Sequence, residues 1–113
     1  MKPEFYIAIP SHNRADSIAS KSLAVLEWWG FPVERVKIFV TPGQEATYRK
    51  RLPAKWADQV RTGAAGLAPN RRAIPRAYPE GVNLLQMDDD IIKFIGSQGQ
   101  ETKSKRRDVT PAE

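Results

Sequence analysis

The sequence contains no cysteine, which excludes a disulfide framework and a thiolate-ligated metal site. It contains a single histidine, His12, and no serine–histidine–aspartate arrangement can be supported around it. No apolar run approaches the roughly 20 residues of a membrane-spanning helix, so no membrane partner is expected. The chain starts without a secretory signal, and together these absences predict a cytoplasmic protein.

The residues that are present are typical of one small globular domain. Hydrophobic residues make up 41% of the 113 positions, enough for a single core. The net charge of +5 favours polyanionic partners such as nucleic acid or nucleotide phosphates, although many basic proteins have none. The composition changes at position 97, which predicts a folded domain over residues 1–96 and a mobile basic tail over 97–113. The tail either touches nucleic acid or is simply solvated.

The first 40 residues predict a strand, a helix and a second strand. Residues 5–9 and 36–40 are apolar and β-favouring throughout, as buried parallel strands are. Residues 15–29 between them show a helical apolar face, and we expect Trp28 and Trp29 in the core. Such a unit belongs to a parallel sheet.

The rest of the chain continues the alternation of helices and strands. Further helices are expected over residues 44–52, 69–73 and 91–95, and further strands over residues 56–61 and 82–87. The sequence therefore predicts an α/β fold with a mainly parallel, Rossmann-like sheet flanked by helices. The carboxyl ends of its first and fourth strands should lie side by side.

Three adjacent carboxylates, Asp88, Asp89 and Asp90, end the apolar run of the fourth strand. They repel each other, and a divalent cation would relieve that repulsion; oxygen ligands suit Mg²⁺ or Mn²⁺. Ligands of open α/β sheets bind beyond the carboxyl ends of the strands, where these acids stand. The alternative is a solvated acidic turn that caps the next helix. If the strand continues through the acids, Asp88 and Asp90 share one side and Asp89 faces the other.

Several arginines are candidate partners for phosphate oxygens, because a guanidinium can contact them with two donors. Taken individually, each is better explained as a surface charge. The glycine-containing loop over residues 63–66 precedes a helix, but it lacks the spacing of a P-loop or a dinucleotide fingerprint. The candidates are Arg14, Arg71, Arg72 and Arg76.

Three segments taken together resemble glycosyltransferases of the GT-A fold. They are Ile-Ala-Ile-Pro-Ser-His-Asn-Arg at 7–14, Gly-Leu-Ala-Pro-Asn-Arg-Arg at 66–72 and Leu-Gln-Met-Asp-Asp-Asp at 85–90. Their order and spacing match over about the first 95 residues. Two segments around the fourth predicted strand, Tyr-Pro-Glu-Gly at 78–81 and Asp-Asp-Asp-Ile at 88–91, most resemble the TET-associated glycosyltransferases of bacteriophages. Those enzymes are implied to attach sugars to hydroxymethylated cytosine in DNA.

The resemblance implies a site for a nucleoside diphosphate sugar, expected to be a UDP-sugar, with Mn²⁺ or Mg²⁺ as cofactor. Asp90 would be the main metal ligand with Asp88 as its partner, and Asp89 would have a structural or sugar-contacting role. Arg71 and Arg72 would approach the diphosphate. The nucleotide pocket would be lined by Pro10, Ser11, His12, Asn13 and Arg14.

The sequence departs from that family in two respects. The carboxylate usually found after the second strand for the nucleobase has only Glu45 as its counterpart. The acceptor half expected after the metal motif is missing, so the sheet should be incomplete on its C-terminal side, and no catalytic residue is assigned. A glycosyltransferase, or its donor-binding half, is therefore one reading. The others are a non-catalytic nucleotide- or nucleic-acid-binding domain and, more distantly, a Mg²⁺-dependent phosphohydrolase.

Overall fold

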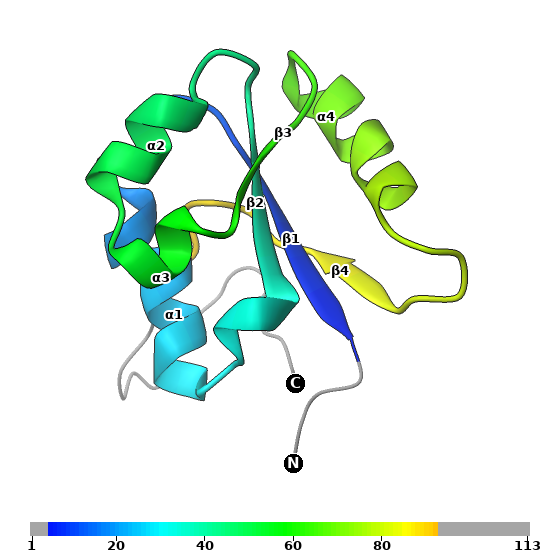
Figure 1. The fold of residues 1–113 in the computed structure, drawn as a ribbon. Helices are drawn as coiled ribbons and strands as arrows, with labels where there is room; N and C mark the ends of the chain where they lie inside the picture. Colours follow the sequence, from blue (N-terminus) through cyan, green and yellow to red (C-terminus); the bar gives the residue numbers. More distant parts are fainter. Residues whose placement is uncertain (1–4, 93–113) are drawn as a thin grey trace.

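The central strand of the domain is β1, Tyr6–Ser11, in the computed structural model, which describes residues 5–92. Strand β2, Val36–Val40, pairs with one side of β1, and β4, Leu84–Gln86, pairs with the other. Strand β3, Val60–Thr62, lies outside β2. All pairs are parallel and the order is β3-β2-β1-β4 (Figure 1). The prediction of a Rossmann-like parallel sheet, with β1 beside β4, is confirmed.

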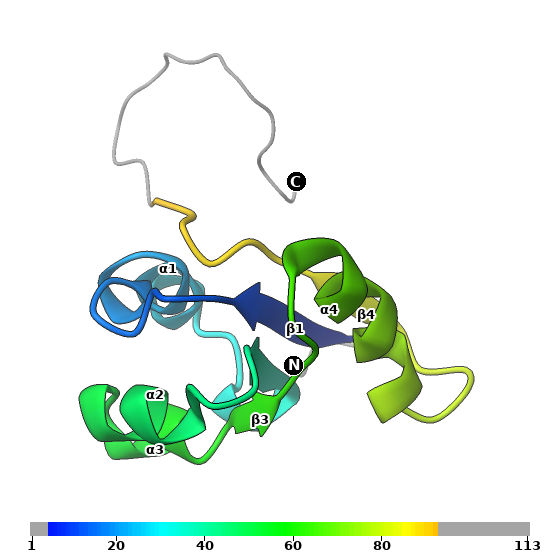
Figure 2. The ribbon, with the colours of Figure 1, turned by 90° about the horizontal axis from the view of Figure 1, so that it is seen from above.

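Helices cover both faces of this sheet. Helices α1, α2 and α3 lie on one side and α4 lies on the other (Figure 2). Their bounds are Ser22–Trp29 for α1, Glu45–Arg51 for α2, Ala54–Ala57 for α3 and Leu67–Ala73 for α4, with 3-10 turns η1 at Ile18–Ser20, η2 at Val33–Arg35 and η3 at Ile74–Ala77. The chain runs outward from β1 to β2 and β3, then returns through α4 to the far side of β1. The strand order therefore reverses between β1 and β4. Because crossovers are right-handed, this change of direction places α4 on the face opposite to α1, α2 and α3.

The larger core lies between the sheet and helices α1 to α3. Ile7 and Ile9 of β1 belong to it, and so does Trp56 of α3. Ala8 belongs to a smaller cluster with Phe39 on the α4 side. Both faces of β1 are thus buried, which explains why its sequence is apolar without alternation.

Strand β1 extends through Pro10, beyond the expected end at residue 9. Tyr6 N donates to Asn83 O and Ala8 O accepts from Met87 N, each at 2.9 Å, so the even residues of β1 turn their backbone groups towards β4. Pairing with β4 ends at Ala8. The missing N–H of Pro10 therefore leaves no ladder bond unmade.

The helix expected over residues 15–29 forms only in its second half, so the prediction is wrong for the first half. The chain forms a turn and η1 there, and α1 begins at Ser22 after Lys21, whose backbone angles are φ −116° and ψ −103°. The expectation that Trp28 and Trp29 are core residues is also wrong, because they are 57% and 46% exposed. Helix α1 buries a narrow stripe that includes Ser22 and Leu26, and the tryptophans fall outside it.

Two expected strands are shorter than predicted. Residues 54–57 form α3 after Pro53, and β3 occupies only the last part of the predicted segment. Trp56 is buried in the core and its Nε1 donates to Glu27 at 2.6 Å. Strand β4 ends at Gln86, and Ile91 and Ile92 are not helical.

The remainder of the expected helix over 91–95 and the tail at 97–113 lie outside the described residues. Within residues 5–92, no helix is long and apolar enough to cross a bilayer.

Candidate functional site

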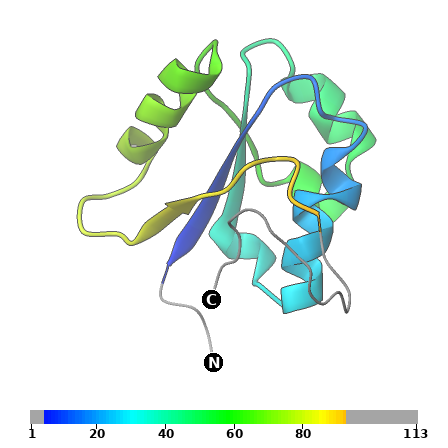
Figure 3. The ribbon, with the colours of Figure 1, turned by 180° about the vertical axis from the view of Figure 1, so that it is seen from behind.

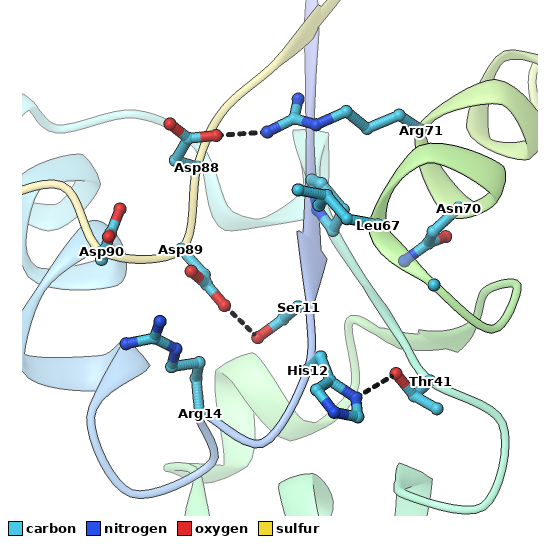
Figure 4. Close-up of a pocket in the computed structure, with 12 residues that line it drawn as sticks. Ser11, His12, Arg14, Thr41, Leu67, Asn70, Arg71, Asp88, Asp89 and Asp90 are labelled. Carbon is cyan, nitrogen blue, oxygen red and sulfur yellow. Dashed lines mark hydrogen bonds and ion pairs between the residues drawn. The ribbon is translucent and has the colours of Figure 1, made fainter.

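A pocket of about 410 Å³ opens at the carboxyl ends of the strands (Figure 4). The segments that follow β1, β2 and β4 contribute to it, together with residues of α4. It stands beside the reversal of strand order between β1 and β4, which is where open α/β sheets bind their ligands. Its lining residues are Pro10, Ser11, His12, Arg14, Thr41, Gly66, Leu67, Asn70, Arg71, Asp88, Asp89 and Asp90.

A chain of hydrogen bonds holds Asp89 at the pocket. Ser11 Oγ donates to Asp89 Oδ2 at 2.8 Å, and Ser11 Oγ lies 2.7 Å from the Tyr48 hydroxyl. That hydroxyl also accepts from the backbone N–H of Arg14 at 2.9 Å. Because Ser11 has one proton and gives it to the carboxylate, Tyr48 must donate to Ser11. The bonds therefore run in one direction, from Arg14 through Tyr48 and Ser11 to Asp89.

Tyr48 is suited to that donor role because it stays protonated. Its side chain comes from α2 and is 1% exposed. Burial raises the pKa of the Tyr48 hydroxyl, and the hydrogen bonds to Ser11 and to the Arg14 backbone oppose that rise in part. The neutral hydroxyl can then donate to Ser11 throughout the neutral pH range.

The acidic loop that follows β4 crosses the end of β1 towards η1 and α1 (Figure 3). The Ser22 hydroxyl fixes it there, since Ser22 Oγ donates to the backbone oxygen of Asp88 at 2.5 Å and accepts from Ile91 N at 3.0 Å. Ser22 is fully buried in the first turn of α1. The break in the predicted helix before Ser22 thus coincides with the anchor of the acidic loop.

The three carboxylates have different surroundings. Asp88 forms an ion pair with Arg71 of α4, and Asp89 is bonded to Ser11. Asp90 makes no hydrogen bond or ion pair with another residue between positions 5 and 92. In Figure 4 the side chain of Asp89 points towards Ser11, whereas those of Asp88 and Asp90 extend to the other side of the loop. The extended strand that the predicted alternation assumed does not continue through the acids, because β4 ends at Gln86 and Asp89 and Asp90 form a turn.

This arrangement limits how a cation could be held. Among the described residues, no three histidine or acidic side chains are grouped so as to hold a metal ion by themselves. Mg²⁺ commonly binds one or two carboxylates and takes its other ligands from water and substrate phosphates. Two carboxylates of the pocket could take part in such a site: Asp90, which has no partner among residues 5–92, and Asp88, if Arg71 moved to a phosphate.

His12 and Asn13 are held by the loop after β2. His12 Nδ1 lies 2.7 Å from Thr41 Oγ1 and His12 Nε2 lies 3.0 Å from Asn13 Nδ2. Gln44 bonds Asn13 twice, through Asn13 N at 2.9 Å and Asn13 Oδ1 at 2.5 Å. Because the Asn13 amide nitrogen can only donate, His12 Nε2 accepts and the proton is on Nδ1. Asn13 has φ 56°, a left-handed conformation that asparagine tolerates better than most residues.

Asn70 ties the start of α4 to the sheet. It is buried, its Nδ2 donates to Phe39 O at 3.0 Å, and its Oδ1 accepts from Ala64 N at 3.2 Å. A Cβ at Gly63 would overlap Asn70 Oδ1 and lie 2.8 Å from Asn70 Cγ, so only glycine fits there. These contacts set the position of the pocket wall that carries Leu67 and Arg71.

The structure brings most of the predicted site residues together. Asn13 and Arg72 do not line the pocket, and Asn13 instead braces His12 from behind. Glu45, the only counterpart for a nucleobase carboxylate, bonds Thr62 Oγ1 at 2.5 Å and Gly43 N at 3.0 Å and is also outside the lining. The predicted residues that do line it are Pro10, Ser11, His12, Arg14, Arg71, Asp88, Asp89 and Asp90.

The sequence did not indicate three of the lining residues, or the residues that support the pocket loops through hydrogen bonds. Thr41, Leu67 and Asn70 line the pocket, while Tyr48 and Gln44 hold its loops from behind. Thr41 carried a usable signal, since it follows a predicted strand at the same edge of the sheet. The others come from helices or helix starts and are placed by contacts between distant segments.

Comparison with protein-family models, curated proteins and solved structures finds no match to this chain. What is established is thus the class of fold, a four-stranded all-parallel α/β domain of Rossmann-like topology.

Proposed function

We propose that this pocket binds the diphosphate and sugar of a nucleoside diphosphate sugar, and that the chain is the donor-binding domain of a glycosyltransferase. The observation that carries the proposal is the gathering of Arg71 and the carboxylates Asp88 to Asp90 at one pocket, beside the reversal of strand order. A guanidinium and carboxylates beside each other suit a phosphate and the cation that accompanies it.

Each side chain has a role that its surroundings support. Asp90, which has no partner among residues 5–92, would be the first ligand of Mn²⁺ or Mg²⁺. Arg71, now paired with Asp88, would exchange that partner for the diphosphate and free Asp88 for the cation. Asp89, fixed through one oxygen by Ser11, would present the other to a sugar hydroxyl. When bound, the cation would neutralise the charge of the leaving diphosphate.

The remaining lining residues fit the nucleoside end of such a donor. His12 and Thr41 lie at the side of the pocket formed by the loops after β1 and β2, away from the acids (Figure 4). Leu67 exposes 63% of its surface and offers an apolar contact for a ring. Arg14 extends from the β1 loop towards the acidic side (Figure 4).

Calorimetry with UDP, in the presence and absence of Mn²⁺, tests the binding step. We expect UDP to bind more tightly with Mn²⁺, and Asp90→Asn to remove the metal-dependent part because it keeps the shape and loses the charge. Asp58→Asn is the matched control, since Asp58 is exposed at the end of α3 and does not line the pocket. Equal metal-dependent affinity in the parent and Asp90→Asn would exclude Asp90 as the ligand.

A transfer assay tests the activity. The resemblance makes a hydroxyl of hydroxymethylated cytosine in DNA the first acceptor to try, with unmodified DNA of the same sequence as the control. Transfer of a labelled sugar from a UDP-sugar to the modified DNA alone would support a glycosyltransferase. Binding of UDP without transfer or hydrolysis would instead support a non-catalytic nucleotide-binding domain.

A further inference from the structure

A second surface, which the pocket does not include, lies on the α4 side of the sheet and runs from the amino end of β1 across β2 to β3. Tyr6 begins β1, and its ring centroid lies 5.8 Å from that of Tyr78, which follows η3. Tyr78 lies 6.1 Å from Phe39 of β2 by the same measure. Helix α4 covers the sheet towards the pocket end, whereas the start of β1 extends beyond it (Figure 1).

Three cations surround these rings. The Arg35 guanidinium stands over the Tyr6 ring, 4.9 Å from its centroid. Lys37 lies two residues before Phe39 on β2, and Arg61 of β3 is in register with Phe39, so both point to this face. We call Tyr6, Arg35, Lys37, Arg61 and Tyr78 the basic aromatic face.

No acid among the described residues forms an ion pair with Arg35, Lys37 or Arg61, the cations of the basic aromatic face. Each is partly buried, so water screens it incompletely. Burial lowers the pKa of Lys37, and the nearby positive charge of Arg61 lowers it further. An anion placed between Lys37 and Arg61 would relieve this repulsion.

We propose that the basic aromatic face binds the phosphate backbone of a nucleic acid. A phosphodiester supplies one negative charge per residue and can accept two donors from an arginine. The partly exposed Tyr6 ring, which already carries Arg35 over one face, offers the stacking and cation–π contacts that single-stranded nucleic acids use. An acidic peptide would satisfy the charges but would leave the rings without a matching partner.

The proposal does not depend on the donor pocket. None of the five residues of the basic aromatic face lines the pocket. Tyr6 lies five residue steps along β1 from Ser11, about 16 Å at the usual rise of a strand, and Arg61 is level with Pro10 but stands two strands away on β3. A variant of the basic aromatic face should therefore leave UDP binding unchanged, and loss of the pocket should leave nucleic-acid binding unchanged.

Fluorescence anisotropy with labelled 20-nucleotide DNA, single-stranded and duplex, tests it on the full chain over a series of salt concentrations. The test variant is Arg35→Gln/Lys37→Gln/Arg61→Gln. A second variant, Arg35→Gln/Lys37→Gln, keeps the bonds of Arg61 to the Asp58 and Val60 carbonyls, which the triple variant loses. The matched control, Lys21→Gln/Lys50→Gln/Lys55→Gln, removes three charges from the other face, at the start of α1, in α2 and in α3.

We expect the triple variant to bind at least about tenfold more weakly than the parent. For duplex DNA, the slope of log affinity against log salt should become shallower by about 2 to 3, because each neutralised phosphate contributes about 0.9 to it. The double variant should lie between, and the control should stay within about twofold of the parent. An equally weakened control, no binding by the parent, or equal competition by polyglutamate at matched charge would each overturn the assignment to nucleic acid.

Discussion

Replacing Tyr48 with phenylalanine tests the hydrogen-bond chain behind the pocket. The change removes one hydroxyl from a side chain that is 1% exposed. That hydroxyl makes two bonds, as the acceptor for Arg14 N at 2.9 Å and as the donor to Ser11 Oγ at 2.7 Å. A buried group left without its partner costs about 1–3 kcal/mol, so we expect Tyr48→Phe to lower the free energy of unfolding by about 2 kcal/mol.

Tyr78→Phe is the matched control for this change. The Tyr78 hydroxyl is buried and has no hydrogen-bond partner among the described residues, and burial raises its pKa to about 12. Removing it deletes an unsatisfied polar atom, so stability should stay equal or rise. Urea unfolding of the parent and both variants measures the difference. Equal destabilisation by the two substitutions would refute the directional chain from Arg14 to Asp89.

Two further predictions concern the scaffold. Gly63→Ala should destabilise the fold by about 1–3 kcal/mol in urea unfolding, because its Cβ would overlap the Asn70 side-chain amide; an unchanged midpoint would contradict the contact. The hydrogen bond from Trp56, followed by that from Lys55, lowers the pKa of Glu27 below 4.5, so this carboxylate stabilises the fold above pH 4.5 and the benefit is lost as pH falls through the lowered pKa. Glu27→Gln should accordingly show a smaller loss of stability in acid than the parent, and an identical acid profile would count against it.

The strands that surround the site could be predicted because their sequences are locally distinctive. Two continuous apolar runs separated by a helical pattern indicated β1 and β2, and the run before Asp88 indicated β4. The position of β4 beside β1 followed from the usual order of such sheets. The helix break at Lys21 could not be predicted from local sequence. It coincides with the hydrogen bond from Ser22 to the acidic loop, which lies 66 residues away in the chain.

The chemistry of the site was only partly visible in the sequence. Ser11, Arg71 and the acids follow strand ends or belong to a recognisable segment, and they do meet at one pocket. The separate environments of Asp88, Asp89 and Asp90 were not visible, because a turn replaces the extended strand that the alternation assumed. Tyr48 looked like one aromatic residue in a short basic helix, and only tertiary packing brings its hydroxyl to Ser11.

Amide hydrogen exchange with and without UDP and Mn²⁺ is the most direct test of where a donor binds. The account predicts slower exchange in three separate segments, residues 10–14, 66–71 and 88–91, which carry the pocket. Residues 33–37, at the amino end of β2, should not change and serve as the internal control. Protection confined to residues 33–37, or no protection with UDP and Mn²⁺ at saturating concentrations, would contradict a nucleoside diphosphate sugar site at the carboxyl ends of β1 and β4.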